Sequence, residues 1–205
     1  MTSSLLATSG LVAAGFLAWS FLEYLIHGLL SHRWRTFAGP LHLEHHRDPR
    51  RVFTSVLVWL PAASLLFVLL ALAVGRHAAG ALALGTLAGF LRHEHVHWRI
   101  HFRRPRSARH ELLRRHHLAH HFRNPEAYHG VTTRFWDRVF GTLPASHAED
   151  YARVAHHPPL EGRSNLGALR PRRAARTSTG GADGGRFLRQ VVQPARLHDG
   201  PPDRR

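Results

Sequence analysis

The chain has 205 residues, enough for one domain, and its 28 basic side chains, all arginine, outnumber 13 acidic ones and give a formal net charge of +15. The absence of cysteine excludes a disulfide framework, a thiolate metal site and a cysteine nucleophile. No nucleic-acid-binding motif accompanies the positive charge, so we expect no nucleic-acid partner and interpret the arginines beside apolar runs as a basic rim that faces anionic lipid.

Three apolar segments are hydrophobic enough to enter a bilayer. Residues 5–30 and residues 52–74 each reach the roughly 20 residues that a spanning helix needs. The third segment, residues 78–91, is shorter and follows a turn at residues 75–77, so we expect it to be the return arm of a helical hairpin. These segments predict an all-α integral membrane protein with a transmembrane helix, a helical hairpin and a His-rich helical cap.

The arginines flank these segments unevenly. Five lie between the first and second segments and five follow the third, namely Arg33, Arg35, Arg47, Arg50 and Arg51, and Arg92, Arg99, Arg103, Arg104 and Arg106. Only Arg76 lies in the hairpin turn, and no arginine precedes residue 5. The positive-inside rule then places both Arg-rich regions, with the histidines, in the cytoplasm. Exclusive use of arginine also fits a GC-rich genome, and we expect a bacterial cell membrane.

The composition changes near residue 145. Residues 1–145 are expected to form the membrane-embedded domain. Residues 146–205 are rich in Arg, Pro and Gly, and we expect them to form a largely disordered C-terminal tail, above all from residue 160 onward.

Ten of the 20 histidines fall into four clusters with ligand-like spacing. The clusters are His27 and His32; His42, His45 and His46; His97 and His101; and His117, His120 and His121. Positions i, i+3 and i+4 share one face of a helix, so imidazoles converge within the last three clusters. His27 and His32 are five residues apart, which predicts either a break or tightening near Gly28 or ligands to two different metals. Ten imidazoles suit two ions with about five ligands each rather than one ion.

Other residues beside the clusters are candidates for supporting the ligands or for replacing one of them. They are Glu23, Glu94, His93, His95, His116, His129, Trp136 and Asp137. Because a metal-bound imidazole normally bonds a carboxylate or a carbonyl through its other nitrogen, Asp137 and Trp136 are expected either to support a ligand in this way or to have a structural role. We expect no catalytic residue beyond the metal ligands. Nitrogen-only ligation is compatible with iron, zinc or copper, but zinc has no redox chemistry, so an oxidation requires iron even if purification loads zinc.

Four stretches and one closing run resemble the histidine boxes of the fatty acid hydroxylase (sterol desaturase) superfamily. The stretches are EYLIH at residues 23–27 with His32, HLEHHRDP at 42–49, EHVHWRIH at 94–101 and HLAHHF at 117–122. The run GVTTRFWDRVFGT at 130–142 is most similar to the fatty acid 2-hydroxylase branch. One departure is Phe102, where the third box usually has a second histidine.

This resemblance, over residues 21–142, implies a membrane-bound di-iron oxidoreductase that uses O2 to hydroxylate a lipid, with a fatty acyl chain as the leading substrate. It implies a separate electron donor similar to cytochrome b5, a ferredoxin or a reductase, and it leaves a homo-oligomer possible. The alternatives are a sterol or carotenoid hydroxylase or desaturase of the same superfamily, and a non-catalytic His-rich metal-binding membrane protein.

Overall fold

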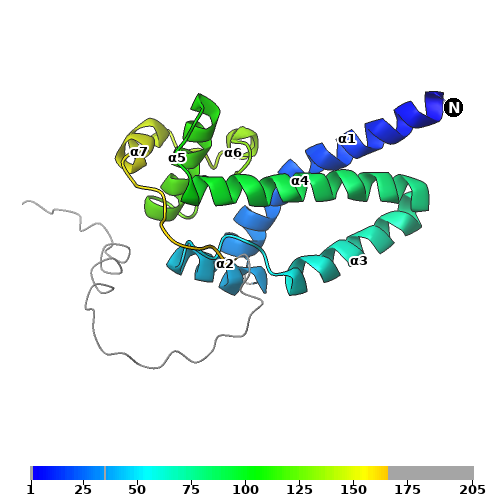
Figure 1. Cartoon of the computed structure of the whole chain (residues 1–205), viewed down its shortest axis with the longest axis horizontal. Coiled ribbons are helices and arrows are strands. Elements are labelled where there is room, and N and C mark those ends of the chain that lie inside the picture. Colours follow the sequence, from blue (N-terminus) through cyan, green and yellow to red (C-terminus); the bar gives the residue numbers. More distant parts are fainter. Residues whose placement is uncertain (1, 35, 166–205) are drawn as a thin grey trace, which may run out of the picture. The chain divides into compact units, whose positions relative to one another are not determined.

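The computed structural model describes residues 2–34 and 36–165, and these residues form helices and loops without a strand. In chain order the elements are α1 (Thr2–Tyr24), the π-helix η1 (Leu25–Arg33), α2 (Ala38–Arg47), α3 (Val56–Val74), α4 (Arg76–Phe102), α5 (Ala108–Phe122), α6 (Phe135–Val139) and α7 (His147–Val154) (Figure 1). The expected all-α class is confirmed.

Helices α1 and α4 pack against each other along a seam of small residues. A Cβ atom at Gly15 would lie 2.1 Å from a carbonyl oxygen of α4, and a Cβ atom at Gly85 would lie 1.9 Å from a carbonyl oxygen of α1. Glycine therefore allows the two backbones to touch, as in close pairs of membrane helices. The seam sets the register in which Glu23 of α1 meets His93 of α4, with 3.2 Å between carboxylate oxygen and Nδ1.

The expected hairpin consists of α3 and α4, which meet at the turn and diverge away from it (Figure 1). Gly75 joins them with φ +79°, a conformation that glycine adopts without a steric cost. No residue of α3 is buried, and Leu57 and Leu72 are 83% and 81% exposed. An apolar helix with exposed side chains on all faces is typical of a membrane span. By length and composition, Ser4–Arg33 and Val56–Val74 are both able to cross a bilayer.

The ordered part of the chain continues past residue 145. Helix α7 packs on α5, and its Tyr151 and Val154 join a buried cluster with Leu118 and Ala119. Tyr151 and Val154 are three residues apart and share one face of α7. This face packs on α5, although the rest of the helix is polar. The expected disorder of residues 146–165 is therefore corrected.

Two contacts further along the chain show that residues 160 and 165 also bond to earlier parts of the structure. The N–H of Leu160 donates to the carbonyl of His101 at 2.7 Å. The Asn165 side chain bonds both backbone groups of Phe53, at 3.0 and 2.8 Å. The rest of the expected tail, residues 166–205, lies outside the described residues, and its separation from the membrane domain stays a prediction.

Candidate metal centre

Elements η1, α2, α4 and α5 bring the ten clustered histidines into two groups of five. The first group is His27, His32, His42, His46 and His120, and the second is His45, His97, His101, His117 and His121. Within each group, one ring nitrogen of every residue lies within 4.8 Å of the others. In the described part of the chain, none of the supporting candidates belongs to either group.

The π-helix explains why His27 and His32 belong to the same group. Its hydrogen bonds join residues five apart, so positions i and i+5 lie one above the other, and the two ring centroids are 5.5 Å apart. The expected break or tightening near Gly28 is wrong, because the helix widens there instead. Ligation of two different metals by this pair is not supported, because both rings face the first group.

Four Nε2 atoms in each group form a closed ring. In the first group the order His27, His42, His46, His120 gives successive separations of 3.0, 2.8, 3.0 and 2.9 Å. In the second group the order His45, His121, His117, His97 gives 3.0, 3.1, 3.0 and 3.1 Å. A ring nitrogen either carries a proton or offers a lone pair, so hydrogen bonds cannot satisfy every pair in such a ring. Convergent lone pairs are what a metal ion requires.

These separations also indicate a coordination geometry. With metal–nitrogen bonds of about 2.0–2.1 Å, two ligands at a right angle lie about 2.9 Å apart, whereas two at a tetrahedral angle lie about 3.3–3.4 Å apart. The observed range of 2.8–3.1 Å matches the right angle. The remaining members, His32 and His101, supply a fifth donor to each group. Each group therefore offers five nitrogen donors, one more than tetrahedral zinc takes.

Backbone carbonyls hold the opposite nitrogen of four ligands. The Nδ1–H groups of His27, His45, His97 and His120 donate to the carbonyls of His129, Arg51, Val52 and Ala127 at 2.5, 3.1, 3.2 and 2.8 Å. A carbonyl only accepts, so Nδ1 carries the proton and Nε2 keeps its lone pair for a metal. The sequence did not reveal these contacts, because any residue type can supply a backbone carbonyl.

Burial keeps the ligands in the form that binds metal. It lowers the pKa of His46 to about 4. It also lowers the pKa values of His117, His120 and His121 well below the usual range, with a further contribution from neighbouring imidazoles. These rings are therefore neutral at pH 7, and metal ligation requires neutral imidazole.

Glu23 and Glu94 hold the segments around the ligands and not the ligands themselves. The buried carboxylate of Glu23 accepts from the N–H groups of Val131 and Thr132, both at 2.7 Å, and from the Thr132 hydroxyl at 2.8 Å. Glu94 accepts from the N–H and hydroxyl of Thr54 at 3.0 and 2.9 Å. Thr54 lies two residues after Val52, whose carbonyl holds His97. Glu94 therefore positions this ligand through the backbone.

Asp137 has the structural one of its two expected roles, because among the described residues it bonds none of the ten histidines directly. It accepts from the N–H groups of His129 and Gly130 at 2.8 and 2.9 Å, from the Thr142 hydroxyl at 2.8 Å and from His116 Nε2 at 3.0 Å. Burial alone would raise its pKa, but hydrogen bonds from His116, Thr142 and Gly130 hold the pKa below its usual range. Asp137 thus fixes the loop whose carbonyl at residue 129 holds the first group.

The other supporting candidates lie at different distances from the centre. His95 is exposed beside Trp98, and Trp136 donates to the Ser20 hydroxyl at 3.2 Å. His116 bonds Asp137 and the Tyr151 hydroxyl. Only His129 packs against the first group: it is buried, and its ring centroid lies 5.7 Å from that of His32. Among the described residues, neither of its ring nitrogens has a hydrogen-bond partner.

A comparison with known protein families matches the part of the chain that contains the histidine boxes. The profile of the family described as fatty acid hydroxylase matches residues 12–142. The chain belongs to this family. The histidine boxes and the closing run, which resembled this family in sequence, all fall within the matched range.

Named members of the fatty acid hydroxylase family match at about one-third identity. The dihydroceramide fatty acyl 2-hydroxylase FAH2 of Arabidopsis thaliana is 34% identical over 145 residues, which cover 65% of this chain and 60% of the relative. The fatty acid 2-hydroxylase of Rattus norvegicus is 31% identical over 153 residues, covering 68% and 41%. The chain thus spans less than two-thirds of the length of either relative.

A solved member has the same fold. The hydroxylase domain visible in full-length scs7p superposes with a TM-score of 0.62 at 25% identity, covering 76% of this chain and 60% of that one. The two histidine groups lie in the described part of the chain and are able to hold metal ions.

Proposed function

We propose that the chain is a membrane-bound, O2-dependent hydroxylase of a lipid, with a fatty acyl chain as substrate and iron at both histidine groups. The observation that carries this proposal is the pair of five-imidazole groups with right-angle spacing between the donors. Family membership and the names of the matched relatives support the reaction class. The nitrogen donors accommodate iron as well as zinc, and an oxidation requires iron, because zinc has no redox chemistry.

When bound, iron would supply the reductive activation of O2 that inserts one oxygen atom into a C–H bond and releases the other as water. Two electrons and two protons complete this balance, and we propose that a separate redox protein delivers the electrons. The chain itself holds four of the ten donors in one tautomer through the carbonyls that bind Nδ1. The five donors of the second group are buried, and their burial would keep bulk water away from that group.

The exposed apolar faces of α1 and α3 supply the route for an acyl chain. Leu17, Leu65 and Leu69 are among their exposed side chains, and such surfaces contact lipid tails in a membrane span. We propose that the lipid reaches the centre from the bilayer and that the histidines lie on the cytoplasmic side, where the arginines would face anionic lipid.

The experiment is a lipid analysis of cells that do or do not express the chain. Lipids that gain the mass of one oxygen atom are expected with the wild type and are absent with His120→Ala, which removes a donor of the first group. His95→Ala is the matched control, because His95 is exposed and outside both groups. If folded, membrane-inserted His120→Ala hydroxylates lipid at the wild-type rate, the proposal is wrong. Products that lose two hydrogen atoms instead would identify a desaturase.

A further inference from the structure

Two adjoining cavities share Arg92 and Arg109 as lining residues. The larger, of about 390 Å³, lies between α1, α4 and the segment from Thr132 to Phe135. The smaller, of about 130 Å³, continues between α4 and the first turn of α5. A volume of about 300–1,000 Å³ is usual for small-molecule sites, so the two together offer space for part of a lipid.

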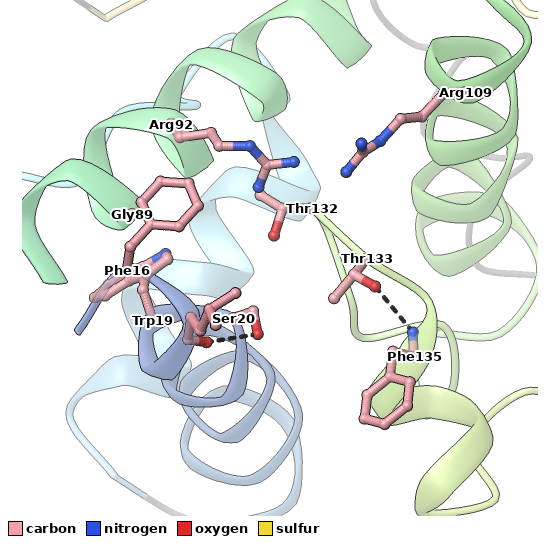
Figure 2. A pocket seen from close by; sticks show the side chains of 10 residues that line it. Phe16, Trp19, Ser20, Gly89, Arg92, Arg109, Thr132, Thr133 and Phe135 are labelled. Atoms are coloured by element: carbon pink, nitrogen blue, oxygen red, sulfur yellow. Dashed lines mark hydrogen bonds between the residues drawn. The ribbon is translucent and has the colours of Figure 1, made fainter. Parts of the chain in front are cut away.

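The two shared arginines point toward one another across the larger cavity (Figure 2). Arg92 is half-buried and Arg109 is exposed. Among the described residues, neither guanidinium forms an ion pair or a hydrogen bond with an acidic side chain. The two like charges repel each other, the nearby Glu23 carboxylate offsets part of the repulsion at Arg92, and an anion between the two guanidinium groups would offset more of it.

A buried donor at the smaller cavity supports the same ligand chemistry. Arg99, one of its lining residues, donates to Nδ1 of His110 at 3.2 Å. Because Nδ1 accepts this bond, the proton of the neutral ring is on Nε2. Nε2 is buried and has no partner among the described residues. A buried N–H group normally has an acceptor, and His110 also lines the smaller cavity.

Apolar side chains also line the larger cavity. Phe16 and Trp19 of α1 and Phe135 of α6 are among them (Figure 2), and the guanidinium carbon of Arg92 lies 6.0 Å from the centroid of the Phe16 ring. Leu17, another lining residue, and Phe135 are 67% and 54% exposed. The cavity thus combines two cationic side chains with an apolar lining, and an amphiphile with one acidic group matches both.

The cavities and the histidines of α4 use different faces of the same helix. Arg92, Val96 and Arg99 line the cavities from one face of α4, while His93, His97 and His101 follow on the adjacent face, about 100° around the helix. Thr132, another lining residue, bonds Glu23, which in turn contacts His93. One layer of side chains therefore connects the cavity lining to the histidine-bearing part of α4.

We propose that the cavities bind the acidic group of an acyl lipid, a carboxylate or a phosphate, between Arg92 and Arg109, with the chain along Phe16 and Phe135. The inference rests on the proposed function and gives it a substrate class: an anionic lipid in preference to an uncharged one such as a ceramide.

The test is lipid retention by the purified full-length chain, measured by native mass spectrometry. Equal amounts of palmitate, phosphatidylglycerol, phosphatidylcholine and a ceramide are offered together. The wild type is expected to retain palmitate or phosphatidylglycerol in preference to the other two. Arg92→Gln and Arg109→Gln are each expected to lower that retention about tenfold, because each removes charge-assisted hydrogen bonds.

Arg104→Gln is the matched control, since Arg104 is exposed and lines neither cavity, and its retention should equal that of the wild type. Arg92→Lys keeps the charge and should preserve part of the binding. Circular dichroism verifies that every variant is folded, and Arg109, being exposed, tolerates substitution. The lipid whose retention falls identifies the acidic group as carboxylate or phosphate.

Retention without preference for an anionic lipid, or an equal loss in Arg104→Gln, would overturn the inference. Because the measurement needs no turnover, its result is separate from that of the proposed function. A chain that retains anionic lipid through both arginines but forms no oxygenated product contradicts the proposed function alone. Wild-type hydroxylation with Arg109→Gln, together with unselective retention, contradicts this inference alone.

Discussion

At the residue scale, the two nitrogens of an imidazole have separate tasks. In His27, His45, His97 and His120 the Nδ1–H group binds a backbone carbonyl, which leaves Nε2 for the metal. The acidic residues act one step further out. Glu23 and Asp137 accept several backbone N–H groups each and thereby fix the loop at residues 129–132. The site therefore depends on buried polar groups that never contact the metal.

His120 tests the division into two groups. The wild type is expected to bind two ions per chain, one in each group. His120→Ala removes a donor of the first group only, so we expect the content to fall to about one ion per chain. Metal analysis by inductively coupled plasma mass spectrometry measures this, with His95→Ala as the control. A fully loaded wild type with one ion or fewer would refute the assignment of two sites.

Asp137 tests the role of the buried carboxylate. Asp137→Asn places an amide N–H₂ group where N–H groups now donate, so at least one buried donor loses its acceptor. We expect the free energy of unfolding to fall by about 2–4 kcal/mol. Unfolding in mild detergent, followed by circular dichroism, measures the change. Asp48→Asn, at a half-exposed carboxylate, should change the free energy by less than about 0.5 kcal/mol. Equal effects of the two substitutions would contradict the proposed role.

At the element scale, two local features determine whether the histidines meet. The π-helix η1 aligns residues five apart, so His27 and His32 share one face. The glycine seam between α1 and α4 sets how these helices are aligned along their axes. An error of one turn in that alignment would move His97 by about 5.4 Å from its partners. The spacing of ligands within a cluster is thus necessary for the site but not sufficient.

Two glycines of α4 form a matched pair for testing the seam. A Cβ atom at Gly85 would lie 1.9 Å from a carbonyl oxygen of α1, whereas a Cβ atom at Gly80 would meet no atom within 4 Å. Gly85→Ala is therefore expected to force the helices apart and to reduce the bound metal by more than half. Gly80→Ala should keep full metal content, because alanine also favours the helix. Equal metal content in the two variants would show that the seam does not align the ligands.

At the scale of the whole molecule, apolar helices and a polar, histidine-lined centre occupy one chain. Exposed leucines of α1 and α3 are suited to a bilayer. The arginines that follow the first and third apolar segments are suited to an anionic membrane surface. The asymmetric distribution of these arginines predicts the orientation, with the histidines on the cytoplasmic side.

Cysteine accessibility tests this orientation without background, because the chain contains no cysteine. His77→Cys, in the hairpin turn, should react with a membrane-impermeant maleimide in intact cells. Ala145→Cys should react only after permeabilisation, because it follows the segments that carry the histidines. Each variant must retain its metal for the comparison to apply. Labelling of Ala145→Cys from outside intact cells would reverse the predicted orientation.

The sequence by itself determined the all-α membrane class, the family and the ten clustered histidines that the structure gathers into two groups. These features are local, since they depend on apolar runs and on the spacing of residues within one helix. The tertiary structure alone decided which histidines share a group, because His120 and His121 are neighbours in sequence yet belong to different groups. It also decided that carbonyls and not Asp137 hold the ligands, and that Arg92 and Arg109 face one cavity. Such contacts join elements far apart in the chain, and their geometry depends on the packing of helices against one another rather than on residue type.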